Sequence, residues 1–105
     1  MKKLFLILAI AAILPACTWV TLTKEGEKVR VLSDAEVGNC KKLGNTTATV
    51  KNTVVGFERN EKKMTKELED LARNAAVNLN GDTVVPSSGI KDGKQTFDIY
   101  RCVNP

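Results

Sequence analysis

The stretch Glu61–Leu79, EKKMTKELEDLARNAAVNL, decides the fold class of this 105-residue chain. Its apolar residues recur at three- and four-residue spacings, which is the pattern of one face of an amphipathic helix. Asn60 is a suitable N-cap, and Glu61 places a negative charge in the first turn. Asn80-Gly81 supplies the stop, with Gly81 free to take the left-handed conformation. The sequence therefore predicts a helix over 61–79, whose core face comprises Met64, Leu68, Leu71, Ala72, Ala75, Ala76 and Leu79.

The opposite face of this helix is charged. Glu69 and Arg73 have the i,i+4 spacing of a favourable ion pair, and a solvated helix face is the simplest interpretation. The carboxylates of Glu67, Glu69 and Asp70 would support acid–base chemistry only if they lined a cleft, which a helix beside a small sheet does not obviously provide. The charged positions are Lys62, Lys66, Glu69, Asp70 and Arg73.

Shorter stretches with a period of two and many β-branched residues predict strands. They lie at 28–32, at 40–51 with its alternating part at 46–50, at 82–85 and at 96–102, while 52–59 is open between a strand extension and a loop. Asp92-Gly93 predicts a tight turn before the last strand, in which Phe97 and Ile99 share one face. The order strand-strand-helix-strand-strand predicts an α+β domain over 28–105. We expect a small antiparallel or mixed sheet of about four strands, with one helix packed on one face.

Composition excludes several functions. The chain has no His, which rules out His-based triads and His metal sites. Its 16 Lys and Arg against 12 Asp and Glu give a net charge of +4, but two of these charges belong to Lys2 and Lys3 at the extreme N-terminus. This excess is too small to indicate nucleic-acid binding. We expect no cofactor and no metal site.

The N-terminus has the features of a secretion signal. Lys2 and Lys3 precede an uninterrupted apolar run from Leu4 to Leu14, shorter than the roughly 20 residues of a membrane span. The alternative is a short buried helix. Leu14-Pro15-Ala16-Cys17 resembles the bacterial lipobox, although Pro15 is not one of its usual residues. The resemblance implies a signal peptide over 1–16 and lipidation of Cys17 with diacylglyceryl and palmitate-type chains, which together anchor stably.

The resemblance to the lipobox also implies roles for the residues that follow it. Residues 17–27 would form a lipid-anchored tether ahead of the domain. Thr18 follows the cysteine where many inner-membrane lipoproteins carry Asp, so we expect the periplasmic face of the outer membrane rather than the inner membrane. With Cys17 assigned to lipid, Cys40 and Cys102 remain, and an exported pair predicts one disulfide. A redox centre or zinc site is disfavoured, because there is no C-x-x-C motif and no His.

Several segments, in order, resemble the small bacterial lipoproteins of domain of unknown function 4156. The resemblance covers most of the chain after the signal and implies fold and location rather than activity. The layout is also distantly similar to RcsF-like lipoproteins, which report envelope stress to the Rcs phosphorelay, but those carry two disulfides. The matching segments are Val29–Leu32, Gly38–Cys40 with Leu43-Gly44, Asp70–Ala76, Asn80–Val85 and Tyr100–Cys102.

The sequence thus favours a non-catalytic binding or structural module of the cell envelope. Its partners would be the membrane, through the acyl chains, and an unidentified envelope protein. The alternatives are an RcsF-like stress sensor and, third, a small carboxylate-based enzyme. Arginine and aromatic side chains are favoured at interfaces. The candidate contact surface is therefore the set Lys41, Lys42, Tyr100 and Arg101, all expected to be exposed.

Overall fold

The computed structural model describes residues 21–51, 53–54, 57–58 and 61–105. The predicted signal peptide, Cys17 and the Asn60 cap lie outside these residues. The described elements, in chain order, are η1 (Gly26–Lys28), β1 (Arg30–Val31), η2 (Asp34–Glu36), β2 (Lys41–Thr49), β3 (Thr53–Val54), β4 (Phe57–Glu58), α2 (Glu61–Asn78), β5 (Thr83–Pro86) and β6 (Lys94–Arg101).

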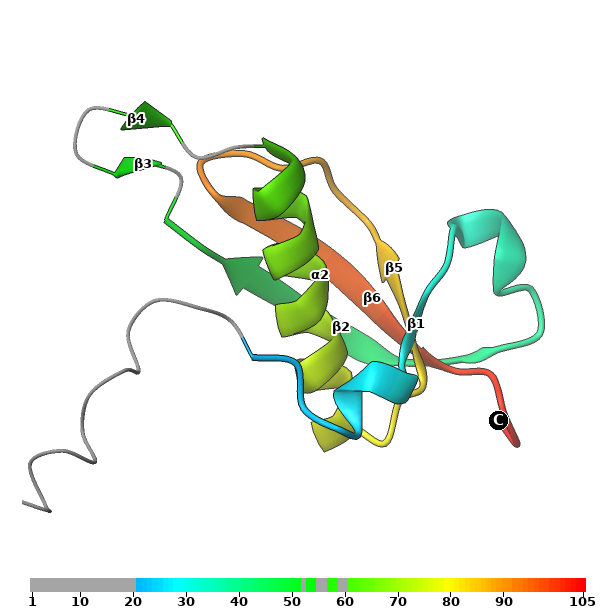
Figure 1. Cartoon of the computed structure of the whole chain (residues 1–105). Helices are drawn as coiled ribbons and strands as arrows, with labels where there is room; N and C mark the ends of the chain where they lie inside the picture. Colours follow the sequence, from blue (N-terminus) through cyan, green and yellow to red (C-terminus); the bar gives the residue numbers. More distant parts are fainter. Residues whose placement is uncertain (1–20, 52, 55–56, 59–60) are drawn as a thin grey trace, which may run out of the picture.

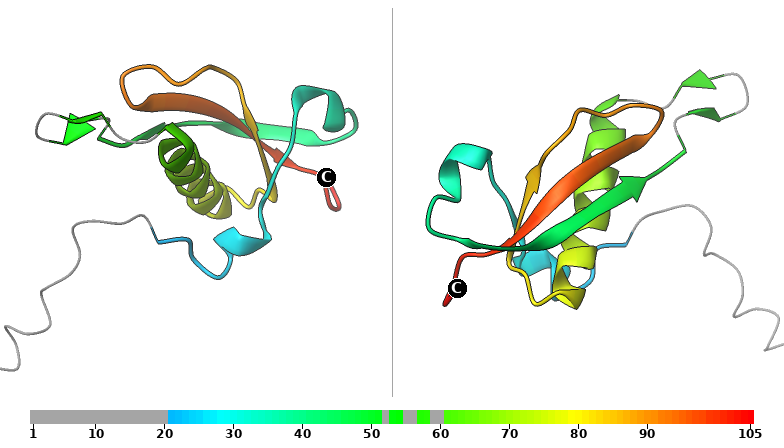
Figure 2. Two further views of the ribbon diagram at one scale, coloured as in Figure 1. Left: turned by 45° about the horizontal axis from the view of Figure 1, so that its top comes forward. Right: turned by 180° about the vertical axis from the view of Figure 1, so that it is seen from behind.

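Among the described residues, a four-stranded sheet and one α-helix form the body of the domain, which confirms the predicted α+β class (Figure 1). The sheet is mixed and has the order β1-β5-β6-β2, in which β1 runs parallel to β5 and the other neighbours are antiparallel. Helix α2 covers one face, and no α-helix of the described residues covers the opposite face (Figure 2). The segment left open by the sequence contains a separate two-stranded ladder of β3 and β4.

The core lies between α2 and the sheet. Leu68, Ala72 and Ala76 are completely buried, as are Phe97 and Ile99 of β6. The predicted helix stripe is thus correct at its centre, because residues spaced by four meet the inward side of β6. Its flanks differ: Leu71 and Ala75 are half-buried, and Leu79 is 43% exposed beyond the end of the helix. No helix among the described residues has the length and apolar character needed to cross a membrane.

The turn after α2 differs from the prediction in one respect. Asn80, with φ 62°, takes the left-handed conformation that the sequence assigned to Gly81. Glycine is needed at position 81 for a different reason: a Cβ there would collide with the Ile99 side chain and crowd the carbonyl of Tyr100. The Gly81 N–H donates to the carbonyl of Ala76 at 2.8 Å and closes the helix.

Residues Thr21–Glu27, which the sequence assigned to a tether, are folded against α2. Asn74 accepts hydrogen bonds from the backbone N–H and hydroxyl of Thr23 at 3.0 and 3.2 Å, and donates to the carbonyl of Thr21 at 2.9 Å. Arg73 donates to the carbonyls of Glu27 and Val29 at 3.0 and 2.9 Å. The described part of the tether therefore belongs to the domain.

The prediction of a solvated charged face on α2 was wrong for Asp70, which is only 6% exposed. Arg73 pairs with Asp70 at 3.3 Å, rather than with Glu69 as its spacing predicted, because the guanidinium is turned toward the carbonyls of the docked segment.

Strand β2 forms one edge of the sheet. It begins with two exposed lysines, Lys41 and Lys42, and its pairing with β6 shifts register between Lys42 and Gly44. Charged residues and bulges are devices by which sheet edges avoid pairing with other chains. The opposite edge is the two-residue strand β1, which is too short to template another strand.

Candidate functional site

On the side of the sheet opposite α2, strands β2 and β6 carry side chains that are exposed or half-buried. Residues that oppose each other in a ladder project to the same side, and alternate residues project to opposite sides. Phe97 and Ile99 face the helix, so Asp98 and Tyr100 face away from it. Thr83 and Val85 of β5, which oppose Tyr100 and Asp98, lie on this side but are buried. We call the remaining surface, formed by β2 and β6, the helix-free face; it comprises Lys42, Asn45, Thr47, Thr49, Lys94, Thr96, Asp98 and Tyr100.

Polar interactions across strands order this face. Lys42 forms an ion pair with Asp98 at 3.4 Å, and the hydroxyls of Thr47 and Thr96 lie 3.3 Å apart. Thr47 is exposed, whereas Tyr100 and Asp98 are half-buried. A surface of hydroxyls, one amide, one aromatic ring and one ion pair can offer hydrogen bonds and a stacking surface to a partner.

The four residues of the predicted contact surface do not lie together. Lys42 and Tyr100 oppose each other on the helix-free face, but Lys41 and Arg101 form the neighbouring ladder position. Arg101 is half-buried rather than exposed, since its guanidinium donates to the carbonyls of Asn80 at 2.6 Å and Asn104 at 3.4 Å. The expectation that Arg101 is exposed was therefore wrong, because its guanidinium holds the turn after α2.

An open depression of about 700 Å³ lies at the hairpin end of the helix-free face. The predicted turn at Asp92-Gly93 is confirmed, with φ 53° and 73°, and the loop before it is held by Ser88. The Ser88 hydroxyl accepts from the N–H of Thr96 at 3.0 Å, and its carbonyl accepts from Gln95 at 3.0 Å. The lining residues are Thr47, Ser88, Gly89, Ile90, Lys91, Asp92, Lys94, Gln95 and Thr96.

The carboxylates that the sequence considered for catalysis lie on α2, on the other side of the sheet from this depression. Burial, followed by the negative charge of Asp70, raises the pKa of Glu69. Asp70 is held by Lys66 at 3.0 Å and by Arg73. Within the described ranges, no group of three metal-ligating side chains lies together. The arrangement on α2 is an ion-pair network beneath the docked N-terminal segment.

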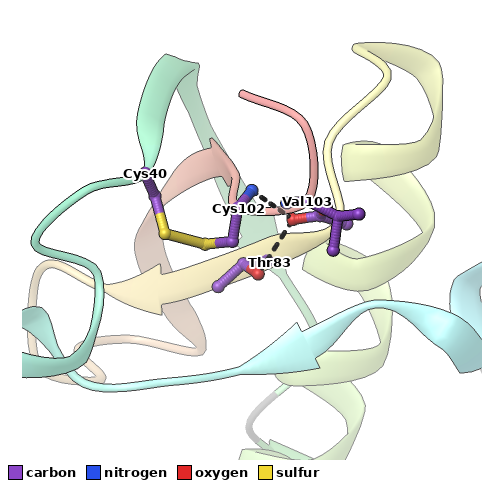
Figure 3. The surroundings of a disulfide bond; sticks show 5 residues. Cys40, Thr83, Cys102 and Val103 are labelled. Carbon is purple, nitrogen blue, oxygen red and sulfur yellow. Dashed lines mark hydrogen bonds between the residues drawn. A yellow bond between two sulfur atoms is a disulfide. The ribbon is translucent and has the colours of Figure 1, made fainter.

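The other end of the sheet is closed by the disulfide between Cys40 and Cys102, which confirms the predicted pairing (Figure 3). The two cysteines are 62 positions apart, and their Cα atoms lie 4.3 Å apart. They extend the ladder by one position beyond Lys41 and Arg101, so the bridge joins opposed residues of neighbouring chain segments. Thr83, which is fully buried, lies beside it (Figure 3).

Asp82 secures this end, a role that the sequence did not reveal. Its carboxylate accepts hydrogen bonds from the N–H groups of Cys102 and Val103 at 2.7 and 2.9 Å, and from the Thr83 hydroxyl at 3.0 Å (Figure 3). Burial raises the pKa of Asp82, but the hydrogen bonds from the Cys102 and Val103 backbone outweigh it and leave the pKa below its ordinary value. The only local indication of this role in the sequence was the position of Gly81-Asp82 directly before a predicted strand.

In the part of the chain that the structure describes, these features define a class of protein: a small α+β domain with one disulfide and one α-helix on a mixed four-stranded sheet, whose other side is partly exposed at β2 and β6. Residues 20–102 match the family described as domain of unknown function, DUF4156. The chain belongs to this family, as the resemblance of its segments implied. No curated protein and no solved structure matches the chain, so the distant similarity to RcsF is not shown.

Proposed function

We propose that this chain is a lipid-anchored lipoprotein of the bacterial cell envelope. In this proposal Cys17 carries the acyl chains, and the domain faces the periplasm from the outer membrane. The domain acts as a non-catalytic binding module that presents its helix-free face to another envelope component.

The observation that supports the anchor is the division of the three cysteines. Cys40 and Cys102 pair with each other, which leaves Cys17 as the one cysteine outside the bridge. That cysteine follows a positively charged, apolar N-terminus of the length typical of secretion signals. Disulfides persist in oxidising compartments, so an exported chain accounts for both the bridge and the remaining thiol.

Metabolic labelling with a palmitate analogue tests the anchor. Wild-type protein should incorporate the label and fractionate with outer membranes, and Cys17→Ala should lose both properties. The matched control is the double variant Cys40→Ser with Cys102→Ser, which removes the bridge and should keep the label. Labelling that persists in Cys17→Ala would refute this site of anchoring.

The helix-free face supports the binding role because its side chains are mostly polar and it borders an open depression. A photo-crosslinking residue at Thr47 should capture a specific envelope protein in cells, since Thr47 is exposed at the centre of this face. The matched position is Lys24, which is exposed on the segment before η1. Equal capture of the same protein from both positions would contradict the assignment of the binding surface.

The stress-sensor alternative makes a different prediction. Deletion of the gene for such a sensor should blunt an envelope-stress reporter, whereas deletion of a binding module without a signalling role should leave the reporter unchanged. The two outcomes separate these functions without knowledge of the partner.

A further inference from the structure

The docked N-terminal segment determines where the chain leaves the domain. Asn74 is bonded to Thr21 and Thr23, and Arg73 is bonded to the carbonyls of Glu27 and Val29. Gly26, which belongs to this segment, is buried against α2, and a Cβ at that position would collide with the side chain of Asn74. The chain is therefore attached to α2 from Thr21 onward, and the segment between Thr21 and β1 is held in place by hydrogen bonds to Asn74 and Arg73.

This attachment leaves a very short connection to the proposed anchor. Cys17 precedes Thr21 by four positions. Even a fully extended chain spans at most about 3.6 Å per residue, so Thr21 lies within roughly 14 Å of Cys17. The acyl chains of a lipidated Cys17 lie in the hydrocarbon region, which places the backbone of Cys17 at the membrane interface.

The side of the domain to which Thr21 belongs is known. Segment η1 packs beside α2, on the side of the sheet that α2 covers, and the helix-free face is turned the other way (Figure 2). We infer that the surface formed by Thr21–Lys28 and the adjoining C-terminal half of α2 lies against the lipid surface, and that the helix-free face points away from it. This inference rests on the lipid anchor proposed above.

Charge does not supply the attraction. The exposed residues around η1 alternate in sign, with Lys24 and Lys28 balanced by Glu25 and Glu27. Attraction of a surface to anionic lipids depends on an excess of Lys and Arg. The short connection alone should therefore hold the domain in this orientation, and the orientation should not depend on salt or on lipid charge.

Site-specific quenching tests the inference on the full lipidated protein. A fluorescent maleimide reacts only with an introduced thiol, because Cys17 is acylated and Cys40 is bonded to Cys102. The labelled variants are Lys28→Cys, beside the proposed lipid surface, and Thr47→Cys, on the helix-free face; both positions are exposed. Lys24→Cys and Thr49→Cys provide a second pair if either variant fails to fold. The vesicles are phosphatidylcholine with a nitroxide on the headgroup.

We expect the nitroxide to quench the label at position 28 several-fold more strongly than the label at position 47, equally in low and high salt. An insertion of about 15 Gly and Ser residues between positions 20 and 21, with an r.m.s. span of roughly 20 Å, should remove most of the difference. Equal quenching at both positions in palmitate-labelled protein would overturn this orientation and leave the anchor intact. A difference that disappears in high salt, or that survives the insertion, would overturn the short connection as its cause. Absence of palmitate from the wild-type protein would refute the anchor and the orientation together.

Discussion

The carboxylate of Asp82 accepts a 2.7 Å hydrogen bond from the backbone N–H of Cys102, so the residue that precedes β5 holds the residue that closes the disulfide. A second bond to the N–H of Val103 extends this hold past the end of β6. The disulfide and the carboxylate thus fix the same short segment from two sides, one covalently and one by charge-assisted hydrogen bonds.

We predict that Asp82→Asn lowers the free energy of unfolding by about 1–3 kcal/mol, because one backbone N–H would lose its charged acceptor. Urea unfolding monitored by circular dichroism measures the change. Asp92→Asn is the matched control, since Asn is equally compatible with the left-handed turn position at which Asp92 lies. Equal effects of the two substitutions would contradict a special role for Asp82.

The same carboxylate should make stability depend on pH. Because the native pKa of Asp82 is below its ordinary value of 3.8, its ionised form stabilises the fold. This contribution is complete above the ordinary pKa and is lost as the pH falls through the lower native pKa. Hydrogen bonds from the Ser33 backbone and hydroxyl lower the pKa of Glu36, which acts in the same direction. The raised pKa of Glu69 acts in the opposite direction.

Urea unfolding at a series of pH values below 5 measures this dependence. Wild-type protein should lose stability more steeply than Asp82→Asn as the pH decreases. Parallel curves for the two proteins would show that Asp82 does not contribute to the acid sensitivity.

Loss of the disulfide should destabilise the domain without changing its lipidation. In the chain-entropy model, a bridge across 62 positions contributes at most about 4 kcal/mol. The double variant Cys40→Ser with Cys102→Ser, or the reduced wild-type protein, should therefore melt at a lower temperature. Cys17→Ala is the control and should melt like the wild-type domain. Identical melting of wild-type protein with and without reductant would contradict the contribution of the bridge.

Docking of the N-terminal segment should depend on Gly26. An alanine there collides with Asn74, so Gly26→Ala should cost about 1–3 kcal/mol and loosen residues 21–28. Hydrogen exchange of the Thr23 and Glu27 amides, both bonded in the docked segment, reports the loosening directly. Gly89→Ala is the matched control, because a Cβ at Gly89 has no neighbour within 4 Å. Unchanged exchange in Gly26→Ala would contradict the close packing.

The parts of the fold that local sequence patterns determine were predicted correctly. The helix, its central core residues and the four strands follow from periodicity, which depends on neighbours a few positions apart. The Cys40–Cys102 pairing followed from counting thiols once the first was assigned to lipid. The strand order and the mixed pairing were left open, because no local pattern specifies which edge a strand of two residues joins.

The parts that the sequence did not show depend on contacts between distant segments. Asn74 and Thr23 are 51 positions apart, so a polar residue on a helix gave no indication that it holds the N-terminal segment. Asp82 bonds to a backbone N–H 20 positions away, and any strand-flanking aspartate would look the same. Arg101 was expected to be exposed but is half-buried, because its partners are backbone carbonyl groups, which carry no sequence signature.

The edge strand β2 has a consequence for the association of the protein with further copies of itself. An exposed edge strand of nine residues could pair with the same strand of another copy and so build a fibril. Strand β2, however, begins with Lys41 and Lys42 and contains a break in register. Two copies of β2 paired in parallel would bring these lysines together, and in either direction the break in register would leave the two backbones uneven. Pairing of two copies through β2 should therefore be less favourable than pairing between two regular, uncharged strand edges.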